Sequence, residues 1–346
     1  MRSSAAAASE PVFEVHAGDA PPGWGDAVAT APGGLFHDQA WARYQCHAGR
    51  ADPLWCTWSE RGEIVGRALA LRRPSGGSLA GRAIGYLFFD SSPVTTQMGL
   101  DLVTPLVRWA SRQRWLLNAS LGSFDAAQPW APADGYEQTR RLEFLVEAKD
   151  GDALWEGMKR WPRQTVRRAR EGGVEVGSAG VAEGAEVFAD LYAQTLEQLR
   201  ERKGVESAPV AREQFAASLE HLLTAGRGRL YLARGPGQEP EGGAFFGVWG
   251  GGAFYLYGGA APQARKSGAG ALVLFEAMRD LLATGTPRIN LGGTPVEASD
   301  PESPDHGLYS FKRRFGAQVV ERTSLSLPVR PGRTAAVGLA RRVLRR

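Results

Sequence analysis

A strand–helix–strand pattern near the C-terminus restricts the possible folds of this chain more than any other feature of its sequence. Residues 254–260, FYLYGGA, alternate around aromatic side chains and end in glycine, which is typical of a β-strand. Residues 263–285 carry apolar side chains at three- and four-residue spacing and predict a helix, and residues 289–291 predict a second strand. Two strands joined in this way are expected to be parallel neighbours in one sheet. The polar residues that follow should therefore lie at a sheet end, where α/β folds bind ligands.

The length and the order of the predicted elements indicate two similar halves. A chain of 346 residues suits two domains, and a hydrophobic content of 43% excludes extensive disorder. Each half is predicted to contain a helix, hairpin strands, a buried strand, a further helix and a further strand, as in a duplicated α/β unit. In the first half these include a hairpin that turns at Arg61-Gly62 and a helix over 96–113. The predicted units are a disordered N-terminus (1–10), a first domain (11–150), a second domain (151–328) and a basic tail (329–346).

Composition argues against several classes of protein. Cys46 and Cys56 are the only cysteines and form no Cys-x-x-Cys pair, and the five histidines show no metal-ligand spacing. Metal catalysis and a disulfide framework therefore have little support, and both cysteines are expected to be inert packing residues. The N-terminus lacks a signal-peptide core, and no apolar run approaches the ~18 residues of a membrane span. We expect a cytoplasmic protein.

The positive charge of the chain is concentrated in its tail. Residues 329–346 contain six arginines and no acid, which exceeds the formal net charge of +4 of the whole chain. The protein is therefore not a uniformly basic nucleic-acid coat. The tail is predicted to form a short basic amphipathic helix on anionic lipid, which would bring the protein to the inner membrane face.

A glycine-rich segment at the start of the predicted helix has the spacing of an anion-binding loop. In Arg265-Lys266-Ser267-Gly268-Ala269-Gly270, the glycines would let backbone N–H groups approach an anion at a helix N-terminus. The R-x-x-G-x-G spacing resembles the pyrophosphate loop of GNAT acetyltransferases, which bind acyl-coenzyme A. The alternative interpretation is an ordinary glycine-rich helix entry with two solvated bases.

Four segments together resemble the signature of a larger family. They are, in chain order, WPRQTVRRAREGGVEV (161–176), FYLYGGA (254–260), LGGT (291–294) and GLYSFKRRFGA (307–317). Their order and spacing are similar to those of the Fem family, the aminoacyl-tRNA-dependent peptidyltransferases that add amino acids to peptidoglycan precursors. The resemblance covers most of residues 150–320 and is partial in the first half, in FHDQAWARYQ and SFDAAQPW. It implies an α/β fold of two tandem GNAT-like domains, here without a coiled-coil arm.

The resemblance assigns roles to a small set of residues. Phe311 and Lys312 match the Phe-Lys pair, whose lysine is expected to support the reacting tRNA terminus. Tyr257 corresponds to the precursor-binding tyrosine, and Tyr255 is expected on the same face of the strand. Tyr255 is also expected to be a core residue, because aromatic residues are common inside sheets. Arg202 matches the family's Arg-x-Gly context.

The first half departs from the family pattern at two places. Trp41 is a further substrate-binding candidate, but the lysine expected shortly after it is absent. The Gly-Pro loop expected after the first buried strand instead reads Asp-Ser-Ser-Pro, over residues 90–93. These departures leave the identity of the precursor open.

Other polar residues have a structural interpretation beside the functional one. Asp125 is expected to be a free loop carboxylate, and His306 has no partner in sequence that would make it a base. A ridge of basic side chains on one predicted helix could contact tRNA phosphates or could be solvated. Its members are Arg163, Arg167, Arg168 and Arg170.

We therefore predict a cofactor-free aminoacyltransferase. The donor would be aminoacyl-tRNA, and the acceptor would be the peptide amine of a UDP-linked or lipid-linked muropeptide precursor. Because the donor ester is already activated, positioning and electrostatics are enough for the transfer. Two alternatives remain: a GNAT-type N-acyltransferase that uses acyl-CoA, and a non-catalytic RNA- or envelope-binding scaffold.

Overall fold

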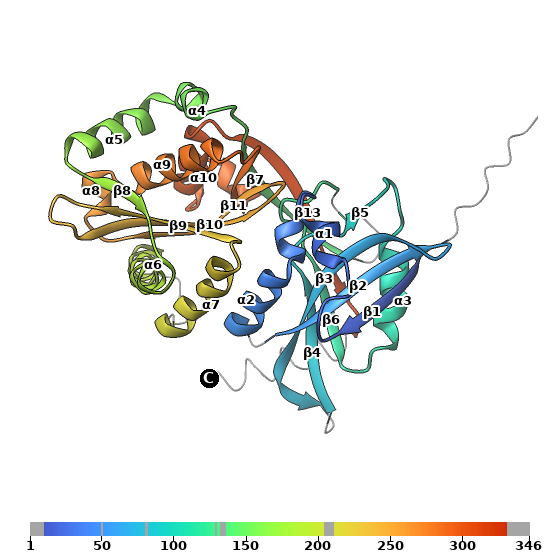
Figure 1. The fold of residues 1–346 in the computed structure, drawn as a ribbon. Coiled ribbons are helices and arrows are strands. Elements are labelled where there is room, and N and C mark those ends of the chain that lie inside the picture. The colour runs from blue at the N-terminus through green and yellow to red at the C-terminus, as the bar shows by residue number, and fades with distance from the viewer. Residues whose placement is uncertain are drawn as a thin grey trace, which may run out of the picture.

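A single sheet runs through both halves of the chain (Figure 1). The computed structural model describes residues 10–49, 51–79, 82–128, 130–131, 136–203 and 211–330. The described strands follow the order β1-β2-β3-β4-β6-β13-β7-β12-β11-β10-β9-β8, and β5 pairs with β3. Residues 1–9 and 331–346 lie outside the described residues, and with them almost all of the predicted terminal segments.

The first half is a mostly antiparallel sheet with helices around it. The predicted hairpin is confirmed, and Arg61 and Gly62 turn it with φ of 51° and 85°. The predicted helix over 96–113 is shorter than expected, because Gly99 has φ of 76° and Asp101 accepts the N–H groups of Val103 and Thr104 at the true helix start. The elements are β1 (Val12–Ala17), α1 (Trp24–Val28), η1 (Gly34–His37), α2 (Gln39–Gly49), β2 (Asp52–Glu60), β3 (Glu63–Leu79), β4 (Arg82–Phe89), β5 (Val94–Thr95), α3 (Val103–Arg112) and β6 (Leu116–Leu121).

The second half contains the predicted strand–helix–strand unit. β11 and β12 are parallel, as expected, but pair only at Ala253–Ile289 and Phe254–Asn290. The connecting helix α9 is buried along its apolar face, as its spacing predicts. The elements are α4 (Gly151–Gly157), α5 (Arg160–Glu171), β8 (Glu175–Ser178), α6 (Val181–Lys203), α7 (Arg212–Thr224), β9 (Gly228–Arg234), β10 (Pro240–Trp249), β11 (Gly252–Ala260), α8 (Ala264–Ser267), α9 (Ala269–Ala283), β12 (Ile289–Pro295), η2 (Val296–Ser299) and α10 (His306–Arg314).

Two long strands join the halves. β7 (Glu137–Val146) pairs with β12, and β13 (Gln318–Pro328) pairs with both β7 and β6. In Figure 1, β13 runs from the helices of the second half into the first half. Each half therefore contributes a strand that lies beside strands of the other. The domain boundary at residue 150 stays a prediction.

The helices divide the core into layers. In the second half, α4, α5 and α9 lie on one face of the sheet, and α6 and α7 lie on the other, where α2 of the first half packs against α7 (Figure 1). One apolar cluster fills each of these faces, and a third lies in the first half. None of the helices in the described ranges combines the length and the hydrophobicity that a membrane span needs.

The double pairing of β13 predicts an unequal response to proline in different strands. Ser326 pairs with Ser120 on one side and Glu137 on the other, so Ser326→Pro should leave at least one buried hydrogen bond unmade and cost about 1–3 kcal/mol or more. The matched control is Gly177→Pro in the edge strand β8, which has a single neighbour. Urea unfolding of both variants measures the difference. Equal losses of unfolding free energy would show that β13 does not join the halves energetically.

Candidate functional site

The candidate site lies where β12 separates from its neighbours. Its pairing with β7 changes register between Asn290 and Gly293, which bulges the strand at the two glycines. Gly292 has φ of 71°, a conformation that favours glycine, and its N–H donates to Asn290 Oδ1 at 2.8 Å. The parallel pairing with β11 has already ended at Asn290. The sheet therefore opens beside Gly292-Gly293.

Lys312 reaches this opening from α10. Its side chain is buried, with 7% of the residue exposed, and its Nζ donates to the carbonyl oxygen of Gly293 at 3.3 Å. A Cβ on Gly292 would lie 3.5 Å from Nζ, in ordinary van der Waals contact, so the backbone conformation and not the space favours glycine here. Burial, and to a smaller extent the nearby Arg141, lower the pKa of Lys312 to about 8, while Glu143 acts in the opposite direction. Lys312 is thus a buried ammonium group that loses its proton as the pH rises through about 8.

The neighbours of Lys312 on α10 fix the helix in place. Phe311 is half-buried and packs edge-on against Phe315, with ring centroids 5.0 Å apart. Both ring nitrogens of His306 are engaged, one with Ala298 O at 3.1 Å and one with Ser310 Oγ at 2.9 Å. His306 therefore ties η2 to α10, with Nδ1 donating to the Ala298 carbonyl and Nε2 accepting from the Ser310 hydroxyl.

A buried network of charges lies next to the opening. Asp125 Oδ2 accepts from Arg288 Nη2 at 2.6 Å, and Asp125 Oδ1 accepts from Asn290 Nδ2 at 3.0 Å. Asn290 Nδ2 also donates to Glu143 Oε2 at 2.9 Å. Burial raises the pKa of both carboxyls, whereas Arg288 and Arg141 lower the pKa of Asp125 and Glu143, respectively. The expectation that Asp125 is a free loop carboxylate is wrong, because its loop packs onto the second half and Asp125 is fully buried.

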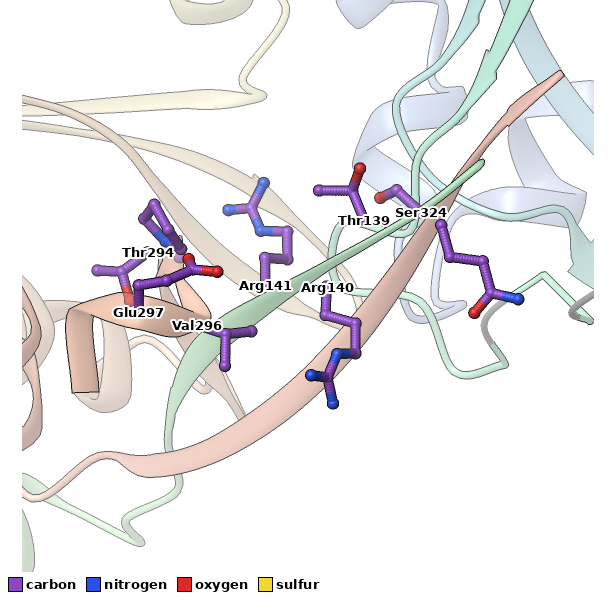
Figure 2. A pocket seen from close by; sticks show the side chains of 10 residues that line it. Thr139, Arg140, Arg141, Thr294, Val296, Glu297 and Ser324 are labelled. Carbon is purple, nitrogen blue, oxygen red and sulfur yellow. The ribbon is translucent and has the colours of Figure 1, made fainter. Parts of the chain in front are cut away.

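A cavity of about 660 Å³ adjoins the same glycines (Figure 2). It lies between the end of β12, the start of η2 and the middle of β7. Gly293 lines it and also accepts the Lys312 hydrogen bond, so one residue connects the cavity with the buried ammonium. The lining residues are Gln138, Thr139, Arg140, Arg141, Gly293, Thr294, Pro295, Val296, Glu297 and Ser324.

The two tyrosines of β11 face opposite sides of the sheet. Tyr255 packs against Phe246 in the core beneath α9, whereas Tyr257 packs against Phe245 in the core beneath α6 and α7. The expectation of a shared face is wrong, because β11 carries a bulge: its register with β10 shifts between Tyr255 and Tyr257, and Leu256 is the extra residue. Tyr255 fits its core interpretation. Lys312 lies beside the backbone of Gly292, and no contact with the Tyr257 side chain is seen among the described residues.

Tyr257 belongs to an aromatic cluster that spans the two halves. Its hydroxyl hydrogen-bonds to the hydroxyl of Tyr44 on α2, and its ring contacts Tyr192 of α6 and Phe215 of α7. Trp41 packs on Tyr44 with ring centroids 4.9 Å apart. The structure therefore brings Trp41 and Tyr257 into one cluster, with Tyr44 as the residue between them.

The first-half side of this cluster carries charge. Trp41 Nε1 donates to Asp90 Oδ2 at 2.8 Å, and Arg73 Nη2 donates to Gln45 Oε1 at 2.8 Å. Burial raises the pKa of Asp90, and the Trp41 hydrogen bond and Arg73 lower it. Arg73 thus supplies a cation near the position where the family lysine is missing.

The basic helix α5 and the glycine-rich loop lie elsewhere in the second half. Arg167 stacks on Trp155 at 5.4 Å, and Arg170 pairs with Glu276 at 2.6 Å, whereas Arg168 is exposed and Arg163 half-buried. In the loop, Arg265 is exposed and Gly270 has open space around it.

Gly268 has a packing role in that loop. A Cβ on Gly268 would lie 2.9 Å from Thr165 of α5, so the glycine permits close helix packing, and its N–H donates to Ala264 O. Arg202 falls in the last turn of α6, and its side chain lies outside the described residues.

Sequence reasoning missed the residues that only the tertiary fold brings together. Arg141, Glu143 and Tyr44 stand in no recognisable motif. A partial signal exists on β7, where two charged residues of opposite sign, Arg141 and Glu143, share one face of a strand whose other face is apolar. The described residues hold no cluster of three or more His, Cys, Asp or Glu suited to a metal ion.

The buried network makes Asp125 essential for stability. Asp125→Ala would leave Arg288, whose side chain is 19% exposed, without its carboxylate, and should lower the free energy of unfolding by about 3–5 kcal/mol. The control is Asp190→Ala, which removes an exposed ion pair with Arg212 and should cost at most about 1 kcal/mol. Chemical denaturation of both variants measures this. A loss at Asp125 as small as at Asp190 would contradict the proposed importance of the network.

Comparison with known proteins shows which folds this chain resembles. Residues 159–313 match the family model of the acetyltransferase (GNAT) domain. The crystal structure of FemX aligns with a TM-score of 0.70 and 15% sequence identity, covering 94% of this chain and 100% of that chain. A comparison with curated proteins finds no significant match.

Two further solved structures have similar folds. L-PGS from Bacillus licheniformis aligns with a TM-score of 0.51 and 12% identity, over 88% of this chain and 92% of that chain. A tandem GNAT protein from the clavulanic acid biosynthesis pathway aligns with a TM-score of 0.50 and 13% identity, over 92% and 98%. At these identities the likeness concerns the fold. The predicted fold class is confirmed: the chain is a mixed α/β protein whose fold resembles tandem GNAT structures, and its residues 159–313 match the acetyltransferase (GNAT) domain.

Proposed function

We propose that this protein transfers an amino acid from aminoacyl-tRNA to the peptide amine of a peptidoglycan precursor. The observation that carries the proposal is the buried ammonium of Lys312, held at the Gly292-Gly293 opening beside a cavity of about 660 Å³. The order of the four sequence segments and the likeness of the fold to FemX over nearly the whole chain support it.

The proposed mechanism needs no covalent intermediate. A neutral amine of the acceptor attacks the ester carbonyl of the donor, and the carbonyl oxygen becomes an oxyanion. The Lys312 ammonium donates a hydrogen bond to this oxyanion in a site with little water, where such a donor stabilises the transition state most. Collapse of the intermediate forms the new amide and breaks the ester bond, and the proton that the attacking amine loses goes to the departing 3′ oxygen of the tRNA. Helix α10 holds Lys312 in place, and the rest of the rate acceleration would come from positioning the two substrates.

The two proposed partners, tRNA and the muropeptide precursor, would contact different parts of the surface. Arg163, Arg167 and Arg168 are the candidates for tRNA phosphates, whereas Arg170 already pairs with Glu276. Binding through such contacts should weaken steeply as salt increases. On the acceptor side, the Trp41–Tyr257 cluster with Arg73 is the candidate contact for a UDP-linked or lipid-linked precursor. The membrane contact of residues 329–346 and the role of Arg202 stay predictions, because they fall almost wholly outside the described residues.

A second candidate is an N-acyltransferase that uses acyl-CoA. The match of residues 159–313 to the acetyltransferase (GNAT) domain favours it, as does the exposed Arg265 with the open space at Gly270. Against it, the Gly268 amide already donates to Ala264 O and the Ala269 amide to Ser267 Oγ. Two of the amides that would bind pyrophosphate are thus occupied within the loop.

One assay separates these functions. The protein is incubated with a muropeptide precursor and either labelled aminoacyl-tRNA or labelled acetyl-CoA. RNase-sensitive transfer of label supports the proposal, and transfer from acetyl-CoA supports the second candidate. Binding of precursor or RNA without product would identify a non-catalytic scaffold.

Replacement of Lys312 should abolish most of the turnover. Lys312→Met keeps an apolar stem in the buried channel but removes the charge, so kcat should fall at least about tenfold. The matched control is Lys149→Met, because Lys149 has 83% of its side chain exposed and lies on the surface. Steady-state kinetics of transfer measures both. Unchanged turnover in Lys312→Met would remove Lys312 from the mechanism.

The pKa of Lys312 also predicts a pH profile. Because this pKa is lowered to about 8, the ammonium is present below pH 8 and is lost as the pH rises through that value. The kcat/KM of the wild type, which reports the free protein, should therefore decline above about pH 8, after any increase due to deprotonation of the acceptor amine. Lys312→Met should retain the increase but lack the decline. A wild-type kcat/KM that keeps increasing through pH 8 to 10 would instead indicate that neutral Lys312 acts as a base.

A further inference from the structure

The cavity beside Gly293 includes a strand edge without a partner. β12 pairs with β7 only as far as Pro295–Arg141, whereas β13 pairs with β7 along its other side from Glu137 onward. Residues 138–140 of β7 therefore have no strand neighbour on the cavity side among the described residues. Such an edge offers main-chain N–H and C=O groups at the spacing of an extended peptide.

Arg141 points into this cavity with unused hydrogen-bonding capacity. Its Nε is buried and has no hydrogen-bond partner in the described structure, and its guanidinium stacks on Phe124 at 4.2 Å. Gly293 gives it room, because a Cβ there would lie 2.3 Å from Arg141 Nη2. In Figure 2, Arg141 and Thr139 extend to one side of β7 and Arg140 to the other. The guanidinium is thus held by packing on Phe124 and by an ion pair with Glu143 at 3.8 Å, which is too long for a hydrogen bond.

Hydroxyl groups complete the donor set around Arg141. Thr294 is 4% exposed, and its Oγ1 has no hydrogen-bond partner within the described ranges. Thr139 and Ser324 lie directly opposite each other on β7 and β13 and also line the cavity. A guanidinium with nearby hydroxyls is the donor set that a carboxylate needs.

The charges of the buried side chains near the cavity also favour binding of an anion. Around the Asp125–Glu143 network, the described residues place four cations, Arg141, Arg288, Arg322 and Lys312, beside two buried carboxylates, Asp125 and Glu143, while the exposed Glu297 also lines the cavity. Glu143 is shared between two guanidiniums, at 3.8 Å from Arg141 and 3.9 Å from Arg322. Two positive charges are therefore uncompensated within this group, which favours an anionic ligand.

We propose that the cavity binds an extended peptide segment, with its main chain paired to β7 at residues 138–140 and its terminal carboxylate on Arg141. A peptide fits better than a nucleotide, because no aromatic face in the cavity lining is available to stack a base and Phe124 is covered by Arg141. Gly293 places such a peptide next to the Lys312 ammonium. The proposal rests on the proposed function in one respect, namely that this peptide is the acceptor of the transfer.

Peptide binding to the full-length protein, without tRNA or coenzyme A, tests this inference. The probes are the pentapeptide Ala-Gln-Lys-Ala-Ala as the free acid and as the C-terminal amide, measured by isothermal titration calorimetry. Wild-type protein should bind the acid at least about tenfold more tightly than the amide, because a hydrogen bond to a charged group is lost in the amide. Arg141→Gln should bind both equally. The control Arg72→Gln, an exposed arginine paired with Asp52, should keep the preference.

A second measurement does not depend on any variant. Single N-methylation of the acid peptide should weaken binding about tenfold at alternate amides and leave it unchanged at the others, as in strand pairing. Equal binding of acid and amide by the wild type, or a preference that survives in Arg141→Gln, would overturn the carboxylate site. Uniform effects of N-methylation would overturn the strand pairing.

The outcomes also distinguish this inference from the proposed function. Peptide binding with the expected acid preference, but no transfer from aminoacyl-tRNA, would refute the function and leave the binding site standing. RNase-sensitive transfer that proceeds equally well onto acid and amide peptides would support the function and refute the binding site.

Discussion

Two carboxylates buried at the junction of the halves, Asp125 and Glu143, determine where the rest of the site can lie. Asp125 comes from a loop of the first half, and its partners Arg288 and Asn290 come from the start of β12 in the second. A buried charge without partners is costly, so the loop, β7 and β12 can reach their positions only together. Asn290 has a further effect, because its side-chain oxygen accepts the N–H of Gly292 and so sets the bulge. The network that joins the halves therefore also opens the sheet beside Lys312.

The two glycines at the bulge serve different neighbours. Gly292 adopts a left-handed conformation next to the Lys312 ammonium, and Gly293 leaves room for the Arg141 guanidinium. A side chain at Gly293 would displace the Arg141 guanidinium, whereas a side chain at Gly292 would strain the left-handed backbone. The Gly-Gly pair read in the sequence as the end of a strand is thus also the contact between two charged groups, one on α10 and one on β7.

Periodicity in the sequence was sufficient for the fold and for part of the site. The strand–helix–strand unit, the first hairpin and the tandem arrangement follow from local patterns, and Lys312 follows from a motif. β13 was not predicted, since residues 318–328 mix charged and apolar side chains and owe their conformation to neighbours on both sides. The bulge at Leu256 placed Tyr255 and Tyr257 on opposite faces, which no alternation rule could anticipate. The contacts of Asp125 with Arg288 and of Arg141 with Gly293 join residues more than a hundred positions apart, so local patterns could not predict them.

The charges of Arg141 and Lys312 couple binding of the acceptor peptide to the protonation of Lys312. Arg141 lowers the pKa of Lys312 by repulsion, and a carboxylate bound on Arg141 would cancel part of that repulsion. The Lys312 ammonium would then keep its proton to higher pH when the acceptor is present than when it is absent. In the proposed mechanism this ammonium stabilises the oxyanion, so a bound acceptor would preserve that hydrogen-bond donor above about pH 8. A transfer that relies on a ready-made ester and uses no covalent nucleophile would gain from this, because it depends on the charged form of Lys312.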